Sequence, residues 1–243
     1  MFAPTDNINA MSPPPFSEFR SLSLYGVCDT MGKTSEKERV IMEHLVIAIS
    51  REYGSGGRRI GEAVSKKLGI SCYDKVLLQL AAERSGLAPE FLEKSEEEAS
   101  GSFLYHLSTA TLGTNFFYQY DVGVGDKAFF AQTAIIRELA DKESCVIIGR
   151  CGENILRERE RCLKVFLYAP EEARIQRLIA EYGITEKEAR ERIHRIDKGR
   201  ANYYRYYTGE HWGRPHAHDL CINTASAGID GAVELIAAMA KRM

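Results

Sequence analysis

The sequence lacks the marks of a membrane-spanning, disulfide-bonded or nucleic-acid-binding protein. Its six cysteines form no C-x-x-C pair, so we expect small buried thiols in a reducing cytosol rather than a disulfide or zinc framework. No apolar run approaches a membrane span. A net charge of −2 does not favour a large nucleic-acid footprint. Because no basic start precedes an apolar core, we expect no secretory signal and a cytoplasmic location.

What is present fits one soluble α/β domain with an extension. The chain has 243 residues, 44% of them hydrophobic and 27% charged, enough for a full core plus a tail or lid. Residues 1–43 carry four prolines and no sustained periodicity, which predicts a disordered extension. Residues 44–243 would form the domain, with a lid at about 185–215. We expect a protein truncated to begin at Met42 to keep its fold and activity.

Strand and helix patterns alternate from residue 45 onward. Near-continuous apolar runs, typical of strands buried on both faces of a parallel sheet, predict strands at 45–50, 70–73, 144–148, 162–168 and 219–223. Helical patterns predict helices at 59–68, 75–85, 103–111, 126–140, 171–182, 186–206 and 229–241. Pro170 marks the start of one helix, and Thr185 with Glu188 forms a capping box for another. The pattern predicts a three-layer α/β sandwich with ligands at the carboxyl ends of the strands.

The first strand leads into a glycine-rich turn, Gly54-Ser55-Gly56-Gly57, and then into a helix. This order directs backbone N–H groups and a helix N-terminus at a phosphate. An ordinary strand-to-helix turn is the alternative, since glycine is common in tight turns. The P-loop pattern G-x-x-x-x-G-K-[ST] is not met, because no lysine follows the glycines. The dinucleotide pattern G-x-G-x-x-G fits less well, since its third glycine falls on Arg59, so we favour a mononucleotide.

Charged residues follow the predicted strands at three places. Arg58 and Arg59 begin the first helix, where cations are disfavoured by the helix dipole, so an anionic partner is expected. Asp74 follows the short second strand. It either caps the next helix, lies near an acceptor substrate, or does both. Arg150 ends a buried strand in Gly-Arg, where it faces the ligand crevice. A surface salt bridge to Glu153 is the alternative for Arg150.

The helix at 186–206 combines an apolar seam with a basic face. Ala189, Ile193 and Ile196 form the seam, Arg192 and Arg195 lie on an adjacent face, and Asp197, Lys198 and Arg200 follow. A charged helix is usually only a solvated face. The dominance of arginine favours a lid that brings positive charge over a transferring phosphoryl group. His216 and His218 lack a third metal ligand, so we expect plain loop residues and no metal site. The tyrosines at 203–207 and Trp212 are expected to pack at the base of the lid.

Together these residues resemble the cytidylate kinase-like family, a branch of the P-loop nucleoside monophosphate kinases. The resemblance covers about residues 45–243. It is carried by Ile47-Ala-Ile-Ser-Arg-Glu-Tyr-Gly-Ser-Gly-Gly-Arg58, Tyr73-Asp-Lys75, Ile147-Ile-Gly-Arg150, Lys164-Val-Phe-Leu167 and Asp197-Lys-Gly-Arg-Ala201. It implies a P-loop NTPase-type sandwich with a parallel sheet and a helical lid, and transfer of phosphate from ATP, with Mg²⁺, to CMP or dCMP. It implies a nucleoside monophosphate as the partner, not nucleic acid or a membrane, and leaves a homo-oligomer open.

The resemblance, together with the charged residues described above, assigns site residues. Gly54, Ser55, Gly56, Gly57, Arg58 and Arg59 would hold the ATP phosphates. Asp74, Arg150, Asp197 and Arg200 would bind the acceptor substrate, with Arg150 on its phosphate. Arg58, Arg195 and Arg200 would be the catalytic cations.

The missing P-loop lysine leaves two registers open. If Gly57 is the last loop glycine, Arg58 takes the lysine place and Arg59 the Ser/Thr place. If the apolar register of the helix decides, Gly57 itself takes the lysine place. In both registers the hydroxyl on the Mg²⁺ side is absent, and Ser50 and Ser55 are the candidates to replace it. A nucleotide-binding module with little catalysis and a kinase for another small acceptor are therefore the alternative functions.

Overall fold

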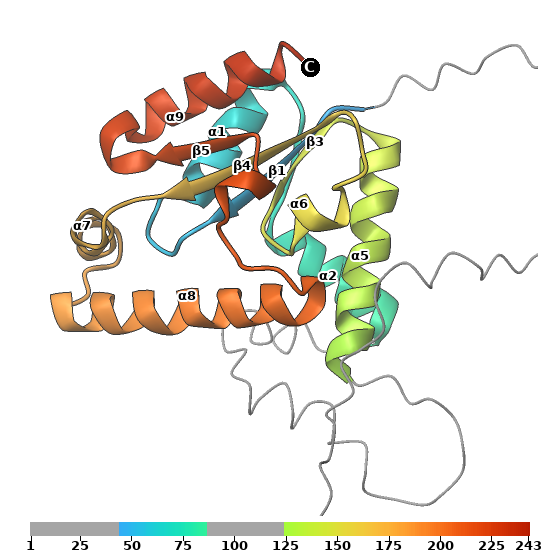
Figure 1. The fold of residues 1–243 in the computed structure, drawn as a ribbon. Coiled ribbons are helices and arrows are strands. Elements are labelled where there is room, and N and C mark those ends of the chain that lie inside the picture. The colour runs from blue at the N-terminus through green and yellow to red at the C-terminus, as the bar shows by residue number, and fades with distance from the viewer. Residues whose placement is uncertain (1–43, 87–123) are drawn as a thin grey trace, which may run out of the picture. The chain divides into compact units, whose positions relative to one another are not determined.

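The computed structural model describes residues 44–86 and 124–243 (Figure 1). The chain divides after Ile41, and all described residues belong to the second unit, Met42–Met243. The predicted N-terminal extension and the helix expected at 103–111 lie outside the described residues.

The described strands form one parallel five-stranded sheet in the order β2-β3-β1-β4-β5. Their bounds are β1 Val46–Arg51, β2 Ser71–Tyr73, β3 Cys145–Ile148, β4 Cys162–Tyr168 and β5 Leu220–Asn223. The register places Ile49 of β1 beside Ile148 of β3 and Val165 of β4. The carboxyl ends of these strands therefore meet at one edge of the sheet, where a ligand site is expected in this architecture.

Helices cover both faces of the sheet and complete the three-layer sandwich (Figure 1). Their bounds are α1 Gly57–Leu68, α2 Lys75–Ser85, α5 Val124–Lys142, α6 Gly152–Ile155, α7 Glu171–Tyr182, α8 Glu186–Thr208, the 3-10 turn η2 Pro215–Ala217 and α9 Thr224–Ala240. The predicted three-layer α/β class with a parallel sheet is confirmed.

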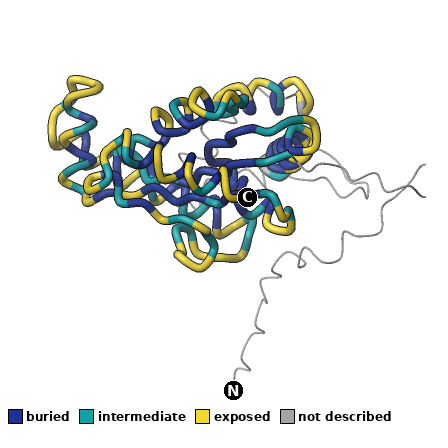
Figure 2. The backbone as a smooth tube through the Cα atoms, turned by 90° about the horizontal axis from the view of Figure 1, so that it is seen from above, coloured by how far each residue is buried: buried dark blue, intermediate teal, exposed yellow. Residues whose placement is uncertain are grey.

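Two apolar cores lie on opposite faces of the sheet because side chains alternate along each strand. Ile47 and Ile49 of β1 pack with α1 and α9, whereas Val46 and Ala48 pack with α2, α5 and the last turns of α8. The side chains of these four residues are fully buried. The tube of Figure 2 is accordingly dark blue along its inner segments and yellow along its outer turns.

The predicted strands are confirmed, each end within one residue. The last helix differs most: α9 begins at Thr224, with a break at Gly228, instead of at residue 229. Sequence periodicity misses the first turn because Gly228 has non-helical backbone angles (φ 68°, ψ 174°) and interrupts the pattern. The four-residue helix α6 is too short to show a period.

The expectation of buried thiols is correct for part of the set. The five described cysteines are free, and Cys145, Cys151 and Cys162 are buried. Cys72 is half-buried. Cys221 is exposed, so the prediction of a buried thiol is wrong for Cys221. Within residues 44–86 and 124–243, no helix is both long and apolar enough to cross a bilayer.

The predicted capping box at α8 is confirmed, because the Thr185 hydroxyl accepts from the Glu188 N–H while the Glu188 carboxylate accepts from the Thr185 N–H. Thr185→Ala is expected to lower the free energy of unfolding by about 1 kcal/mol. Hydrogen bonds from the backbone and side chain of Thr185 lower the pKa of Glu188, so the carboxylate half of the box is present at neutral pH and lost as pH falls through the lowered value. The bond from the Glu188 N–H to the Thr185 hydroxyl does not titrate. Urea unfolding at neutral pH measures the difference, and equal stability of variant and wild type would contradict the capping role.

Candidate functional site

The glycine turn between β1 and α1 has the backbone geometry of an anion cradle. Gly54 and Gly56 have φ of 78° and 84°, in the left-handed region that favours glycine. Gly56 is the N-cap of α1, which begins at Gly57, so the free N–H groups of the helix start face the turn. No acidic residue occupies the first turn of α1. An anion is the ligand that this helix end favours.

A cavity of about 530 Å³ opens over this turn at the carboxyl ends of β1 and β3. Its lining comes from the glycine turn, the start of α2, the end of β3, α7 and α8. Six of the lining residues are cationic: Arg51, Arg58, Arg59, Lys75, Arg150 and Arg200. Four are acidic: Glu52, Glu62, Asp74 and Glu181. The excess of positive charge beside a phosphate-type cradle favours a polyanionic ligand.

The structure brings most of the predicted site residues together around this cavity. The predicted residues that line it are Gly54, Gly56, Gly57, Arg58, Arg59, Asp74, Arg150 and Arg200. Three others do not: Ser55 is fully buried, Arg195 is exposed on α8, and Asp197 points at the glycine turn itself. The ligand roles of all these residues stay predictions.

Arg150 occupies a strained position at the end of β3. Gly149, Arg150 and Cys151 are three successive left-handed residues with φ of 75°, 61° and 53°. Only glycine adopts this region without cost, so the two side-chain-bearing residues each carry strain of about 1–3 kcal/mol. Arg150 is 5% exposed and lines the cavity. A side chain this buried does not lie on the surface, so any pairing with Glu153, which is 2% exposed, would be an internal one. Strain of this kind concentrates at functional sites.

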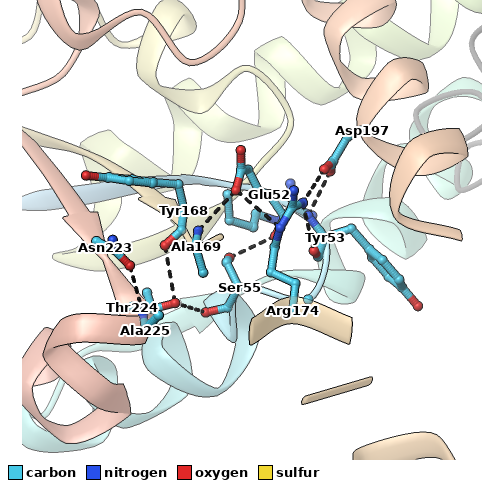
Figure 3. A network of polar contacts seen from close by, with 12 residues as sticks. Glu52, Tyr53, Ser55, Tyr168, Ala169, Arg174, Asp197, Asn223, Thr224 and Ala225 are labelled. Carbon is cyan, nitrogen blue, oxygen red and sulfur yellow. Dashed lines mark hydrogen bonds and ion pairs between the residues drawn. The ribbon is translucent and has the colours of Figure 1, made fainter. Parts of the chain in front are cut away.

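A polar network holds the glycine turn against α7 and α8 (Figure 3). The Tyr53 N–H donates to Asp197 Oδ1 at 2.8 Å, and Arg174 Nη1 donates to Asp197 Oδ2 at 2.5 Å. Arg174 Nη1 also donates to the Tyr53 carbonyl, and its Nε lies 3.5 Å from Glu52 Oε2. The Ala169 N–H donates to the same Glu52 oxygen at 3.1 Å. Asp197 therefore positions the turn through both of its oxygens.

Two further contacts fix the carbonyl side of the turn. Thr224 Oγ1 donates to the Ser55 carbonyl at 2.8 Å, and Arg177 Nη1 donates to the Gly54 carbonyl at 2.6 Å (Figure 3 shows the former). Arg200 Nη1 donates to the Arg51 carbonyl at 3.1 Å. With these carbonyls engaged by side chains, the opposite side of the turn is left to present N–H groups. No sequence pattern pointed to Arg174, Arg177 or Thr224, since each contacts the turn from more than 100 residues away.

Arg58 and Asp74 face each other across the cavity mouth. Arg58 Nε lies 2.8 Å from Glu62 Oε1 and 3.8 Å from Asp74 Oδ2, and its hydrogen bond with Glu62 raises its pKa. Asp74 is the N-cap residue of α2, but its side chain makes no capping hydrogen bond. Asp74 thus has the chain position of a cap but not its side-chain hydrogen bond. Its carboxylate lines the cavity instead.

The hydroxyls proposed to replace that of the P-loop pattern are both engaged within the protein. Ser50 Oγ donates to Glu153 Oε1 at 2.6 Å, and Ser55 Oγ donates to the Glu52 carbonyl at 2.8 Å. Ser50 is 3% exposed and Ser55 fully buried. Neither lines the cavity.

Gly56→Ala tests whether the turn geometry matters for binding. The new Cβ would lie 2.5 Å from Ile229 Cδ1 at a φ of 84°, so it would displace that methyl group and strain the turn. Gly183→Ala is the matched control: it also has positive φ, at 65°, but has open space around the new Cβ and lies outside the cavity. Both should cost about 1 kcal/mol of stability. Only Gly56→Ala should abolish thermal stabilisation by ATP; equal stabilisation in both variants would contradict the cradle.

Comparisons with known proteins find several similar chains. The chain is similar to an uncharacterized protein from Eubacterium ventriosum ATCC 27560, with 27% identity, a TM-score of 0.61, and coverage of 82% of this chain and 99% of that one. It is also similar to shikimate kinase from Bacteroides thetaiotaomicron, at 16% identity and a TM-score of 0.47, covering 81% of this chain and 98% of that one. A gluconokinase from Sinorhizobium meliloti 1021 matches at 15% identity and a TM-score of 0.46, covering 82% and 95%.

The comparison with curated proteins finds no match. The comparison with protein families finds one over most of the described domain, at residues 46–226, and the matched family is described as the cytidylate kinase-like family. This span takes in the glycine turn, Arg150 and the basic helix α8. The chain therefore belongs to the cytidylate kinase-like family.

Proposed function

We propose that this protein transfers the γ-phosphoryl group of ATP to CMP or dCMP, forming ADP and CDP or dCDP. The observation that carries the proposal is the convergence of the glycine turn with Arg150 and Arg200 around one cationic cavity. Three separate segments supply these groups: the β1–α1 turn, the end of β3 and the middle of α8. Membership of the cytidylate kinase-like family supports the nucleoside monophosphate as acceptor.

Each group has a distinct part in the proposed reaction. The N–H groups around Gly54 and Gly56 hold the ATP phosphates at the start of α1, where the helix dipole favours negative charge. Arg150 holds the acceptor phosphate, for which the planar guanidinium offers two parallel hydrogen bonds. Arg200, which is 8% exposed and anchored to the start of the turn, adds positive charge from α8.

The reaction requires no general base. An oxygen of the acceptor phosphate, already ionised at neutral pH, attacks the γ-phosphorus of ATP. The bond between this phosphorus and the bridging oxygen breaks, and its electron pair stays on the β-phosphate of ADP. The protein contributes positioning and neutralisation of the charge on the transferring group. A buried cationic site performs both tasks.

Mg²⁺ is expected to accompany ATP, because it binds mainly through substrate phosphates and one or two carboxylates. Asp74 lines the cavity and its side chain makes no capping hydrogen bond, so it is the carboxylate that fits this need. When bound, Mg²⁺ would neutralise charge on the phosphates of ATP.

The second candidate is a nucleotide-binding module with little catalysis. It is favoured by the engaged hydroxyls of Ser50 and Ser55 and by the glycine at the start of α1, where the P-loop pattern has a lysine. A kinase for another small acceptor is the third, since P-loop folds serve many acceptors.

A coupled assay for ADP separates these functions. The protein is mixed with ATP and Mg²⁺, and with each nucleoside monophosphate in turn, and ATP-induced thermal stabilisation is measured in parallel. The proposal predicts turnover with CMP or dCMP above that with purine monophosphates. Turnover with another acceptor alone supports the third candidate. Stabilisation by ATP without any turnover supports the binding module and overturns the kinase.

A further inference from the structure

The residues at the end of β1 and at the start of α1 both depart from the P-loop pattern. With Gly56 as N-cap and last loop glycine, the P-loop pattern places its first glycine at position 51 and its lysine at position 57. Here position 51 is arginine and position 57 is glycine. The structure thus favours the second of the two registers left open by the sequence.

The two changes depend on each other through space. A Cβ added to Gly57 would lie 2.7 Å from both Cβ and Cγ of Arg51. Atoms of real side chains do not approach this closely, so a lysine at position 57 and the arginine at position 51 exclude each other. The stem of Arg51 fills the space through which a side chain from the first turn of α1 would pass.

The far end of Arg51 reaches the acceptor side of the cavity. A Cβ added to Gly149 would lie 2.1 Å from Arg51 Nη1 and 2.7 Å from its Cζ, so the guanidinium lies directly over the Gly149 backbone. Gly149 precedes Arg150, and both Arg51 and Arg150 line the cavity. The guanidinium of Arg51 therefore lies between the glycine turn and the residue proposed to hold the acceptor.

Arg58, the other candidate to replace the lysine, is placed less well. Its side chain is 62% exposed and is held by Glu62 at the cavity mouth. Arg58 is exposed, whereas the guanidinium of Arg51 contacts the Gly149 backbone. The charge of Arg58 is thus paired with the surface carboxylate of Glu62.

We infer that Arg51 supplies, at the transferring phosphoryl group, the positive charge that a lysine supplies in P-loop proteins. This inference rests on the proposed function and names the catalytic cation of that site. A guanidinium suits the task because it stays charged and can bridge two phosphate oxygens. The competing role for Arg51 is a structural partner of the buried Glu153, whose pKa its charge lowers against the effect of burial.

Three variants of the full chain test the inference. Arg51→Ala should lower kcat by about 10²–10³-fold and weaken ATP binding at least tenfold, with little change in AMP binding. Gly149→Ala keeps the arginine but displaces its guanidinium, so it should lower kcat in the same direction. The double variant Arg51→Gly with Gly57→Lys should have a kcat at least tenfold higher than that of Arg51→Gly alone, because it restores the P-loop arrangement.

Arg84→Ala is the control, since Arg84 pairs with Glu138 on the surface and lies outside the cavity. A loss of thermal stability in Arg51→Ala without selective loss of ATP affinity over AMP assigns Arg51 to the structural role and overturns the inference. Normal kcat in Arg51→Ala beside a large loss in Arg58→Ala also overturns it. If the wild type binds ATP without turnover, the kinase proposal fails, and the ATP and AMP affinities of Arg51→Ala still decide the inference. Absence of ATP binding by the wild type overturns both.

Discussion

Replacing Arg150 by alanine is expected to lower kcat/KM for the nucleoside monophosphate by about 10²–10³-fold, with KM raised and kcat lowered. The reason is that Arg150 is buried at the end of β3, lines the cavity and faces the place proposed for the acceptor phosphate. Two charge-assisted hydrogen bonds would be lost at once, each worth about 1.5–3 kcal/mol. Arg200→Ala should instead act mainly on kcat. Steady-state kinetics with varied acceptor at saturating ATP measures both.

The backbone of Arg150 supplies a control for folding. At a φ of 61°, Arg150→Gly should be as inactive as Arg150→Ala but more stable than it by about 1 kcal/mol, since glycine relieves the left-handed strain. Arg150→Lys keeps the charge without the planar fork and should lose part of the activity. Wild-type kinetics in Arg150→Ala and Arg150→Gly would show that the acceptor site is elsewhere.

Asp197→Asn is expected to lower the free energy of unfolding by about 2–4 kcal/mol. Asp197 accepts from the Tyr53 N–H and from Arg174, which is 8% exposed, so the neutral amide leaves a buried guanidinium facing an N–H donor. The glycine turn loses its link to α8, so thermal stabilisation by ATP should fall as well. Urea unfolding with and without ATP measures both effects.

Asp141→Asn is the matched control, because Asp141 also pairs with an arginine, Arg159, but is 75% exposed. It should change stability by less than about 1 kcal/mol. If Asp197 instead contacts the acceptor, as the family resemblance implies, the variant would raise the KM of the acceptor at unchanged stability. That outcome would contradict the positioning role inferred from its contacts.

The strands and helices were largely predictable because their signals are short-range. The apolar runs of β1 and β3 and the capping box at Thr185 each lie within a few residues, and the structure confirms them. The break at Gly228 and the four-residue α6 escaped the same reasoning, since one interrupts a period and the other is shorter than a period. Membership of the cytidylate kinase-like family was predictable too, because several short motifs fall in a consistent order along the chain.

The candidate site was predictable in position but not in its internal contacts. Gly54, Gly56 and Arg150 follow strands whose carboxyl ends meet at one edge of a parallel sheet, so sequence order alone places them together. Asp197 was expected to bind substrate, yet its oxygens are turned to Tyr53 and Arg174. Such pairings join residues more than 20 and up to 144 positions apart, and no local pattern encodes them.

By itself, then, the sequence determined the parallel α/β class, the phosphate-type glycine turn and the absence of a lysine after it. Only the tertiary structure decided which cation fills the space beside Gly57, where the P-loop pattern has its lysine. The choice depends on whether the space beside Gly57 is open or filled, and the packed Arg51 side chain fills it. Steric exclusion of this kind arises between segments that meet only after folding, so the missing lysine could be read from the chain, whereas its candidate replacement could not.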